Sequence, residues 1–234
     1  MIGIIVQLAL SWLITWFLLK RDLSVLGLGP TNKRLIDFAI FFLITAALSS
    51  TDFLFRAWFA DQRWALNPNL STKLIFTGIW WNIKSVLFEE LIFRGVLLYI
   101  LIKKIGATKA IIISSIGFGI YHWYSHEVIG DPKAMIITFV TTGAMGLIYA
   151  YGYAKTFSLY VPIAIHLGWN LVRSVVFSET VIGDQLLVTV KPVPVVTISY
   201  FQYYVWLFFP IVSALSVNYL LLKRHVQVAD GNEY

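Results

Sequence analysis

The sequence predicts an all-α fold, a polytopic membrane helical bundle with seven transmembrane helices, or eight if the third apolar segment breaks. Two observations lead to this expectation. Of the 234 residues, 59% are hydrophobic and only 13% are charged, whereas an ordinary soluble domain carries about 25% charged residues. Apolar runs of about 20 residues recur along the chain, which is the length a helix needs to cross a hydrocarbon core. The lipid bilayer is therefore the expected solvent of this protein.

Seven apolar segments, separated by short clusters of charged residues, are the expected helices. They are Met1 to Leu19, Leu35 to Ala60, Leu74 to Ile102, Ala110 to Trp123, Ala134 to Ala154, Thr156 to Phe177, and Val195 to Leu222. The first lacks a basic stretch in front and a cleavage site behind, so we expect a retained helix. The third would span about 43 Å as one straight helix, so we expect it to tilt, break or protrude. In the sixth, Pro162 predicts a kink or a lost backbone hydrogen bond.

The distribution of Lys and Arg predicts how the chain is oriented. If the N-terminus lies outside, most of the basic residues fall in cytoplasmic loops or ends, as the positive-inside rule expects. The C-terminus is then cytoplasmic, and we expect the plasma membrane of a prokaryote. This distribution explains the net charge of +6 better than nucleic-acid binding does, so no nucleic-acid partner is expected.

Two further features of composition limit the function. No linker, low-complexity stretch or internal repeat divides the chain, so a single integral membrane domain over residues 1–234 is expected. Cysteine is absent, which excludes disulfides, thiolate metal sites and a cysteine nucleophile.

Glu89, Glu90 and Arg94 lie within the third apolar segment, where an unpaired charge is costly. Glu90 and Arg94 are four residues apart, which predicts an ion pair on one helical face. Glu89 points about 100° away from Glu90 and is free to face a cavity. The alternative is a helix break at the membrane surface, with both glutamates in water.

Two further apolar segments carry histidines. His122 ends the fourth, where an interfacial residue is as reasonable as a functional one. His166 and Asn170 share one helical face in the middle of the sixth. They form either part of a site or a polar clamp to a neighbouring helix. Counted from the proposed cytoplasmic ends, Glu89, His122, His166 and Asn170 lie about 15 to 21 Å deep. A shared depth favours one common site.

Two other groups of charges are expected to be structural. Asp52 and Arg56 are four residues apart and predict an ion pair. Lys84 and Arg173 are expected to extend toward the membrane interface by snorkelling.

Three motifs together resemble those of the CAAX-protease and bacteriocin-processing (CPBP/Abi) intramembrane peptidases, a family that includes the Ras-converting type II CAAX endopeptidases and the Abi-type immunity proteins. The motifs are Glu89-Glu90-x-x-x-Arg94, Phe118-x-x-x-His122 and His166-x-x-x-Asn170. They occur in the family's order, each on its own apolar segment, and cover a core of about residues 74–177. The resemblance implies an intramembrane endopeptidase that acts on a peptide or membrane-protein substrate.

The resemblance also implies a role for each matched residue. Glu89 corresponds to the catalytic glutamate, and His122 to the histidine that helps it activate water. His166 and Asn170 correspond to the pair that binds the tetrahedral oxyanion.

Glu90 and Arg94 would orient and support these groups. Members of the family are commonly called metalloproteases, and if zinc is the cofactor, Glu89, His122 and His166 would hold it. Asn170 in place of a third strong ligand favours direct, metal-independent hydrolysis.

Two other classes of function remain open on the sequence. Buried Glu, His and Arg side chains also build the proton relays of ion-coupled transporters, although no inverted repeat is visible. A non-catalytic membrane scaffold or immunity protein would have no need of every motif residue.

Overall fold

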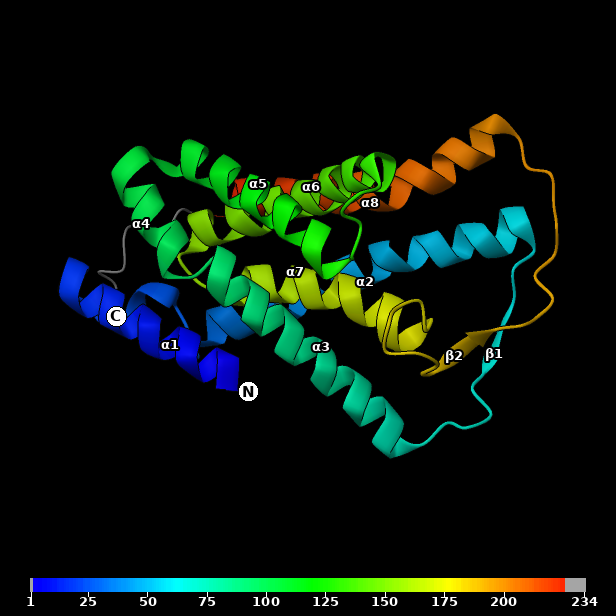
Figure 1. Cartoon of the computed structure of the whole chain (residues 1–234), viewed down its shortest axis with the longest axis horizontal. Helices are drawn as coiled ribbons and strands as arrows, with labels where there is room; N and C mark the ends of the chain where they lie inside the picture. Colours follow the sequence, from blue (N-terminus) through cyan, green and yellow to red (C-terminus); the bar gives the residue numbers. More distant parts are fainter. Residues whose placement is uncertain (1, 226–234) are drawn as a thin grey trace.

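The computed structural model describes residues 2–225, so Met1, residues 226–234 and the predicted cytoplasmic C-terminus lie outside the described residues. Within this range the chain folds into a bundle of helices, and the predicted all-α class is confirmed (Figure 1). The α-helices are α1 (Ile2–Ile14), α2 (Asn32–Ala60), α3 (Thr72–Phe93), α4 (Val96–Ile105), α5 (Ala107–Ser125), α6 (Pro132–Thr156), α7 (Tyr160–Leu171) and α8 (Tyr200–Arg224). π-Helical turns over Thr15–Leu19 and Val172–Val176 extend α1 and α7.

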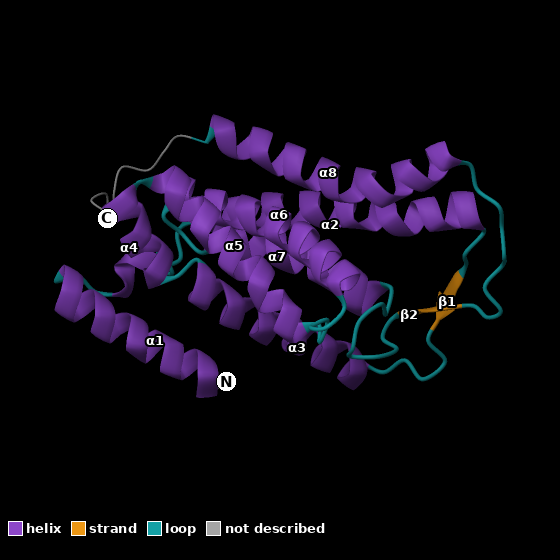
Figure 2. Ribbon diagram, turned by 45° about the horizontal axis from the view of Figure 1, so that its top comes forward, coloured by secondary structure: helices purple, strands orange, loops and turns teal. Residues whose placement is uncertain are grey.

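Four helices of the described range are long and apolar enough to cross a membrane by length and composition. They cover Ile2–Leu19, Asn32–Ala60, Pro132–Thr156 and Tyr200–Arg224. Helix α7 lies inside the bundle, where it packs against α2, α3 and α6. Helices α2 and α8 run side by side along one flank, and α1 lies along the opposite flank against α3 (Figures 1 and 2). The short helix α7 is thus surrounded by longer helices.

The third predicted segment breaks into α3 and α4 at Arg94 and Gly95. A Cβ at Gly95 would lie 2.1 Å from the carbonyl oxygen of Leu91, so only glycine fits this bend. Helix α4 has 10 residues and rises about 15 Å, too little to cross a membrane alone. The break separates the end that carries Glu89 from the short helix behind it.

The turn between α6 and α7 lies where the sixth segment was predicted to begin. Thr156 ends α6, and α7 begins at Tyr160. The kink predicted at Pro162 was wrong. This proline is the third residue of α7, where the backbone N–H has no partner within the helix and its loss costs little.

The ends of the helices follow local capping signals. Ser71 caps α3, and Asp131 caps α6 with Pro132 as its first residue. Ser199 and Gln202 form a capping box at α8, which begins five residues later than the predicted Val195. The described residues also contain a short pairing that the sequence did not predict, between the antiparallel strands β1 (Trp64–Leu66) and β2 (Leu187–Thr189) at one end of the bundle (Figure 2).

Candidate functional site

Three helices bring the predicted site residues together in the bundle interior. Glu89 lies near the end of α3, His122 near the end of α5, and His166 in the middle of α7. Glu89 Oε2 lies 3.8 Å from His122 Nε2 and 3.9 Å from His166 Nε2. All three residues are at least 90% buried. The shared depth inferred from the sequence therefore corresponds to a real meeting point of these three side chains.

The two oxygens of Glu89 have different surroundings. Oε1 accepts a hydrogen bond from Ser85 Oγ, one turn earlier on α3, at 3.3 Å. Oε2 is buried and has no hydrogen-bond partner. Its distances to the two histidine nitrogens exceed a hydrogen bond but allow one oxygen atom to bridge each pair. Ser85 thus restrains one oxygen while the other faces both imidazoles.

Glu90, Arg94 and His166 form a second set of contacts behind Glu89. Glu90 and Arg94 are completely buried, and the predicted ion pair between them is present at 3.4 Å. Glu90 Oε1 also lies 2.7 Å from His166 Nδ1, a contact that the sequence did not predict. Arg94 in turn donates to the carbonyl oxygen of Gly146 on α6 at 3.1 Å. Helix α6 thereby holds Arg94, Arg94 holds Glu90, and Glu90 orients the ring of His166.

The two histidines differ in the groups that face their Nδ1 atoms. His122 Nδ1 lies 2.8 Å from the carbonyl oxygen of Phe118, which can only accept a hydrogen bond. His122 Nδ1 is therefore the protonated nitrogen, and in the neutral ring Nε2 presents a lone pair toward Glu89. His166 Nδ1 lies 2.7 Å from the Oε1 atom of Glu90, a carboxylate oxygen that can accept its hydrogen.

Asn170 is the one predicted site residue that the structure does not join to the others by a contact. It lies one turn after His166 on α7 and is half-buried, and its side chain makes no hydrogen bond with the described residues. Its backbone carbonyl accepts from Ser174 Oγ at 2.6 Å, and the same hydroxyl contacts Asn82 on α3 at 3.0 Å. The amide of Asn170 is thus open to a ligand.

Several contacts that support the site were not predicted from the sequence. The ring of Tyr149 stacks on His166 at 4.7 Å with an interplanar angle of 16°. The guanidinium of Arg94 lies 4.1 Å from the centroid of the Phe118 ring. A Cβ at Gly146 would lie 3.1 Å from both Arg94 and Phe118. The spacing of Ser85 four residues before Glu89 was a usable signal, but nothing in the sequence connected α6 to this site.

The described residues contain no group of three or more His, Cys, Asp or Glu side chains arranged to hold a metal ion. Glu89, His122 and His166 converge, but their separations of 3.8 and 3.9 Å exceed the roughly 3.4 Å between tetrahedral ligands about 2.1 Å from zinc. As they stand, these residues do not fit a zinc site.

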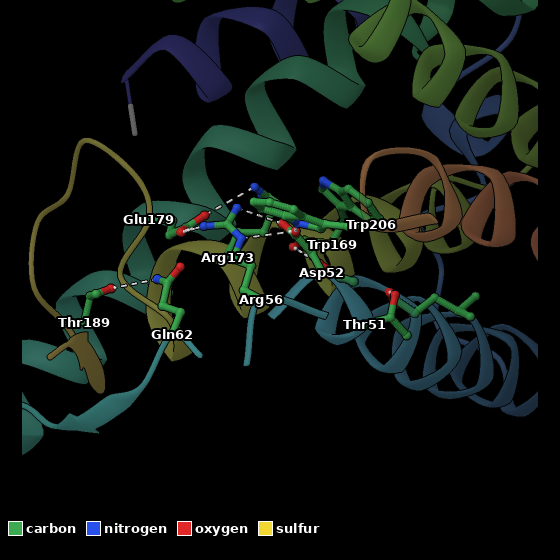
Figure 3. Close-up of polar contacts among 11 residues, drawn as sticks. Thr51, Asp52, Arg56, Gln62, Trp169, Arg173, Glu179, Thr189 and Trp206 are labelled. Carbon is green, nitrogen blue, oxygen red and sulfur yellow. Dashed lines mark hydrogen bonds and ion pairs between the residues drawn. The ribbon is translucent and has the colours of Figure 1, made fainter. Parts of the chain in front are cut away.

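A second polar cluster, the Asp52 network, lies between α2, α8 and the end of α7 (Figure 3). Asp52 accepts from Arg56, from Arg173 at 2.7 Å and from Trp206 at 2.6 Å. Glu179 pairs with both arginines. The predicted Asp52–Arg56 pair is confirmed. Arg173, for which snorkelling was predicted, pairs with the same two carboxylates.

Known proteins resemble the part of the chain that carries the motifs. The sequence model described as type II CAAX prenyl endopeptidase Rce1-like matches residues 71–172. "Putative membrane peptidase YdiL" of Bacillus subtilis (strain 168) is 35% identical over 89 residues, which are 38% of this chain and 32% of that protein. The similarity thus spans about a third of the relative's length. No solved structure matches the chain significantly.

The matched range begins one residue before α3 and ends just beyond α7, so it contains all three motifs and each side chain around Glu89. The resemblance inferred from the motifs is therefore confirmed: the part of the chain that carries them is similar to the Rce1-like type II CAAX prenyl endopeptidases and to a bacterial membrane peptidase.

Proposed function

We propose that this protein is an intramembrane endopeptidase that hydrolyses a peptide bond with water activated by Glu89. One observation carries the proposal. The buried, unpartnered Oε2 of Glu89 faces Nε2 of both His122 and His166. An open carboxylate oxygen between two imidazoles is suited to hold and deprotonate one water molecule.

Glu89 and His122 have complementary parts in activating water. The water donates one hydrogen to Glu89 Oε2 and the other to the lone pair of His122 Nε2. As its oxygen attacks the scissile carbonyl carbon, Glu89 takes the first proton. Ser85 supports this step because it keeps the other oxygen of Glu89 turned away from the histidines.

His166 has the opposite task, to donate a hydrogen bond to the developing oxyanion. Glu89 and Glu90 bring two negative charges into this interior, and Arg94 balances one of them. A doubly protonated His166 balances the other, so that Nδ1 donates to Glu90 and Nε2 donates to the oxyanion. The open amide of Asn170 supplies the second donor.

The tetrahedral intermediate then collapses. The carbon–nitrogen bond breaks, and Glu89 returns the proton to the leaving amine. The products are a new carboxyl terminus and a new amino terminus, and Glu89 is again a carboxylate. This sequence of steps needs no covalent intermediate, in keeping with the absence of cysteine from the chain.

The substrate is proposed only as a class, a peptide or a membrane protein whose cleavage site reaches the bundle interior. The family description names prenylated CAAX proteins, but no described residue of this chain selects a prenyl group. Residence in a prokaryotic plasma membrane likewise stays a prediction. A substrate within the bilayer agrees with the depth of Glu89 in the bundle.

The proposal is tested with purified protein in proteoliposomes and a broad panel of membrane peptides. Wild type should cleave at least one peptide, and Glu89→Ala at equal folded concentration should cleave none. Treatment with a metal chelator should leave the cleavage unchanged. Equal cleavage by both proteins, or cleavage by neither, would count against the peptidase and favour a transporter or scaffold.

A further inference from the structure

A hollow opens at the end of the bundle where α2 begins and α8 ends. It is a small depression that is open to the outside, and the turn between α6 and α7 closes one side. Lys33 and Arg34 from α2, Tyr160 from α7 and His225 behind α8 are among its lining residues. It shares no lining residue with the site around Glu89, although α7 contributes to both.

Positive charge exceeds negative charge around this hollow. Asp37 is its one acidic lining residue in the described range, and His225 Nε2 contacts it at 3.0 Å. Lys155, Lys223 and Arg224 do not line the hollow, but they lie within two residues of lining residues, in the last turns of α6 and α8. Neither these three residues nor Lys33 forms an ion pair with a carboxylate of the described residues. An anion is therefore the ligand that the charge distribution favours.

The hydroxyl groups at the hollow build its wall. Ser158 Oγ donates to the carbonyl oxygen of Gly27, and Tyr160 OH donates to that of Leu28. The loop before α2 is thereby tied to the start of α7. Recognition of an anion is left to the cationic side chains at the rim.

An apolar track leads away from the hollow along α2. Lys33, Ile36 and Ile40 are spaced by three and four residues and share one helical face. Ile36 is 58% exposed and Ile40 is 44% exposed. Both belong to a helix long and apolar enough to cross a membrane. A ligand with a negatively charged headgroup and an apolar tail would match the basic hollow and the apolar surface beside it.

We propose that the hollow binds the phosphate of an anionic phospholipid, with one acyl chain along Ile36 and Ile40. Basic pockets between membrane helices recognise lipid headgroups in this way. A free phosphate would match the hollow but leave the apolar track without a role. The site is separate from the proposed peptidase centre and does not depend on that function.

The test measures lipid binding by the full-length protein in neutral detergent. Phosphatidylglycerol should raise the thermal unfolding midpoint by a few degrees more than phosphatidylcholine does. Native mass spectrometry should show phosphatidylglycerol retained on the wild type. Lys33→Glu should weaken its dissociation constant about tenfold or more, and Lys33→Arg should bind as the wild type does.

Lys104→Glu is the matched control, because Lys104 is also exposed and ends a helix but lies outside the hollow. It should retain the lipid as the wild type does. Three results would overturn the proposal: equal shifts with both lipids, an equal loss of binding in Lys33→Glu and Lys104→Glu, or an equal shift with inorganic phosphate alone.

Discussion

The site around Glu89 and the Asp52 network both place two carboxylates among packed helices, but they differ in how these are paired. In the Asp52 network each carboxylate contacts two arginines, and Trp206 donates to Asp52 as well. Around Glu89, buried atoms remain without hydrogen-bond partners, namely Glu89 Oε2, Glu90 Oε2 and Arg94 Nε. Among these, Glu89 Oε2 is the one that lies near two histidine nitrogens.

This difference in pairing indicates that the carboxylates of the Asp52 network are structural, whereas Glu89 is reactive. Leaving a buried acceptor open costs stability, so it persists where a ligand or reactant completes the pairing. A network in which every carboxylate is paired, such as the Asp52 network, is more stable, but it leaves no carboxylate oxygen free to accept a hydrogen bond from a substrate or water. Pairing in the structure, more than burial or charge, therefore points to Glu89 as the reactive carboxylate.

Glu89→Gln should have the largest effect on activity. The amide keeps the shape of the side chain but cannot take a proton, so kcat should fall by about 10² to 10⁴-fold. Thermal stability should stay equal or rise, because the substitution removes the desolvation cost of a buried carboxylate whose Oε2 has no hydrogen-bond partner. Peptide turnover and thermal unfolding on one protein preparation measure both. A variant that unfolds at lower temperature would show that Glu89 belongs with the structural charges.

Asn170→Ala should have the next largest effect. Loss of an oxyanion donor lowers kcat by about 10² to 10³-fold, whereas stability should change little because the side chain has no hydrogen bond to lose within the described residues. The readout is kcat and KM, and the loss should fall on kcat. An increase in KM alone would instead indicate a role in substrate binding.

Asp52→Asn should have the reverse pattern. It removes a charge shared by Arg56 and Arg173 and turns an amide toward guanidinium groups, so unfolding should become easier by about 1–3 kcal/mol. Turnover per folded molecule should stay close to that of the wild type. Denaturant unfolding in detergent measures the free energy of unfolding, and the peptide assay measures the turnover. A loss of turnover as large as in Glu89→Gln would remove the distinction between the two regions.

Gly146→Ala should have the smallest effect on turnover, because it disturbs Arg94, which reaches the catalytic side chains through Glu90. The added methyl group would crowd Arg94 and Phe118 at 3.1 Å, which should cost about 1 kcal/mol and lower turnover slightly. Gly143→Ala is the control on the same helix, since its methyl group would meet an ordinary contact at 3.6 Å. The control should be neutral or stabilising. Equal behaviour of the two variants would argue against support from α6.

Much of the fold was predictable because the apolar segments are long and clearly separated. The boundaries that failed depended on single residues. The break at Gly95 needs the close approach of the Leu91 carbonyl, which hydropathy does not record. Pro162 lies in the first turn of a helix and does not kink it, because the preceding helix ends at Thr156. Such boundaries depend on the positions of turns, which the pattern of apolar residues predicts poorly.

The candidate site was predictable where residues on one helix or at one depth determined it. The Glu90–Arg94 pair followed from spacing, and the meeting of Glu89 with the two histidines followed from depth. The contact between Glu90 and His166 could not be predicted, because it joins α3 to α7 through the relative rotation of the two helices. The stacking of Tyr149 on His166 depends on helix packing in the same way.

Hydrolysis in water enriched in ¹⁸O tests the central claim most directly. Wild type and Glu89→Gln are incubated with the same membrane peptide, and single-turnover products are analysed by mass spectrometry. The mechanism proposed for Glu89 predicts one ¹⁸O atom in the new carboxyl terminus formed by the wild type and almost no product from the variant. Labelled product from both proteins at equal rates would contradict it, because the water would then be activated without Glu89.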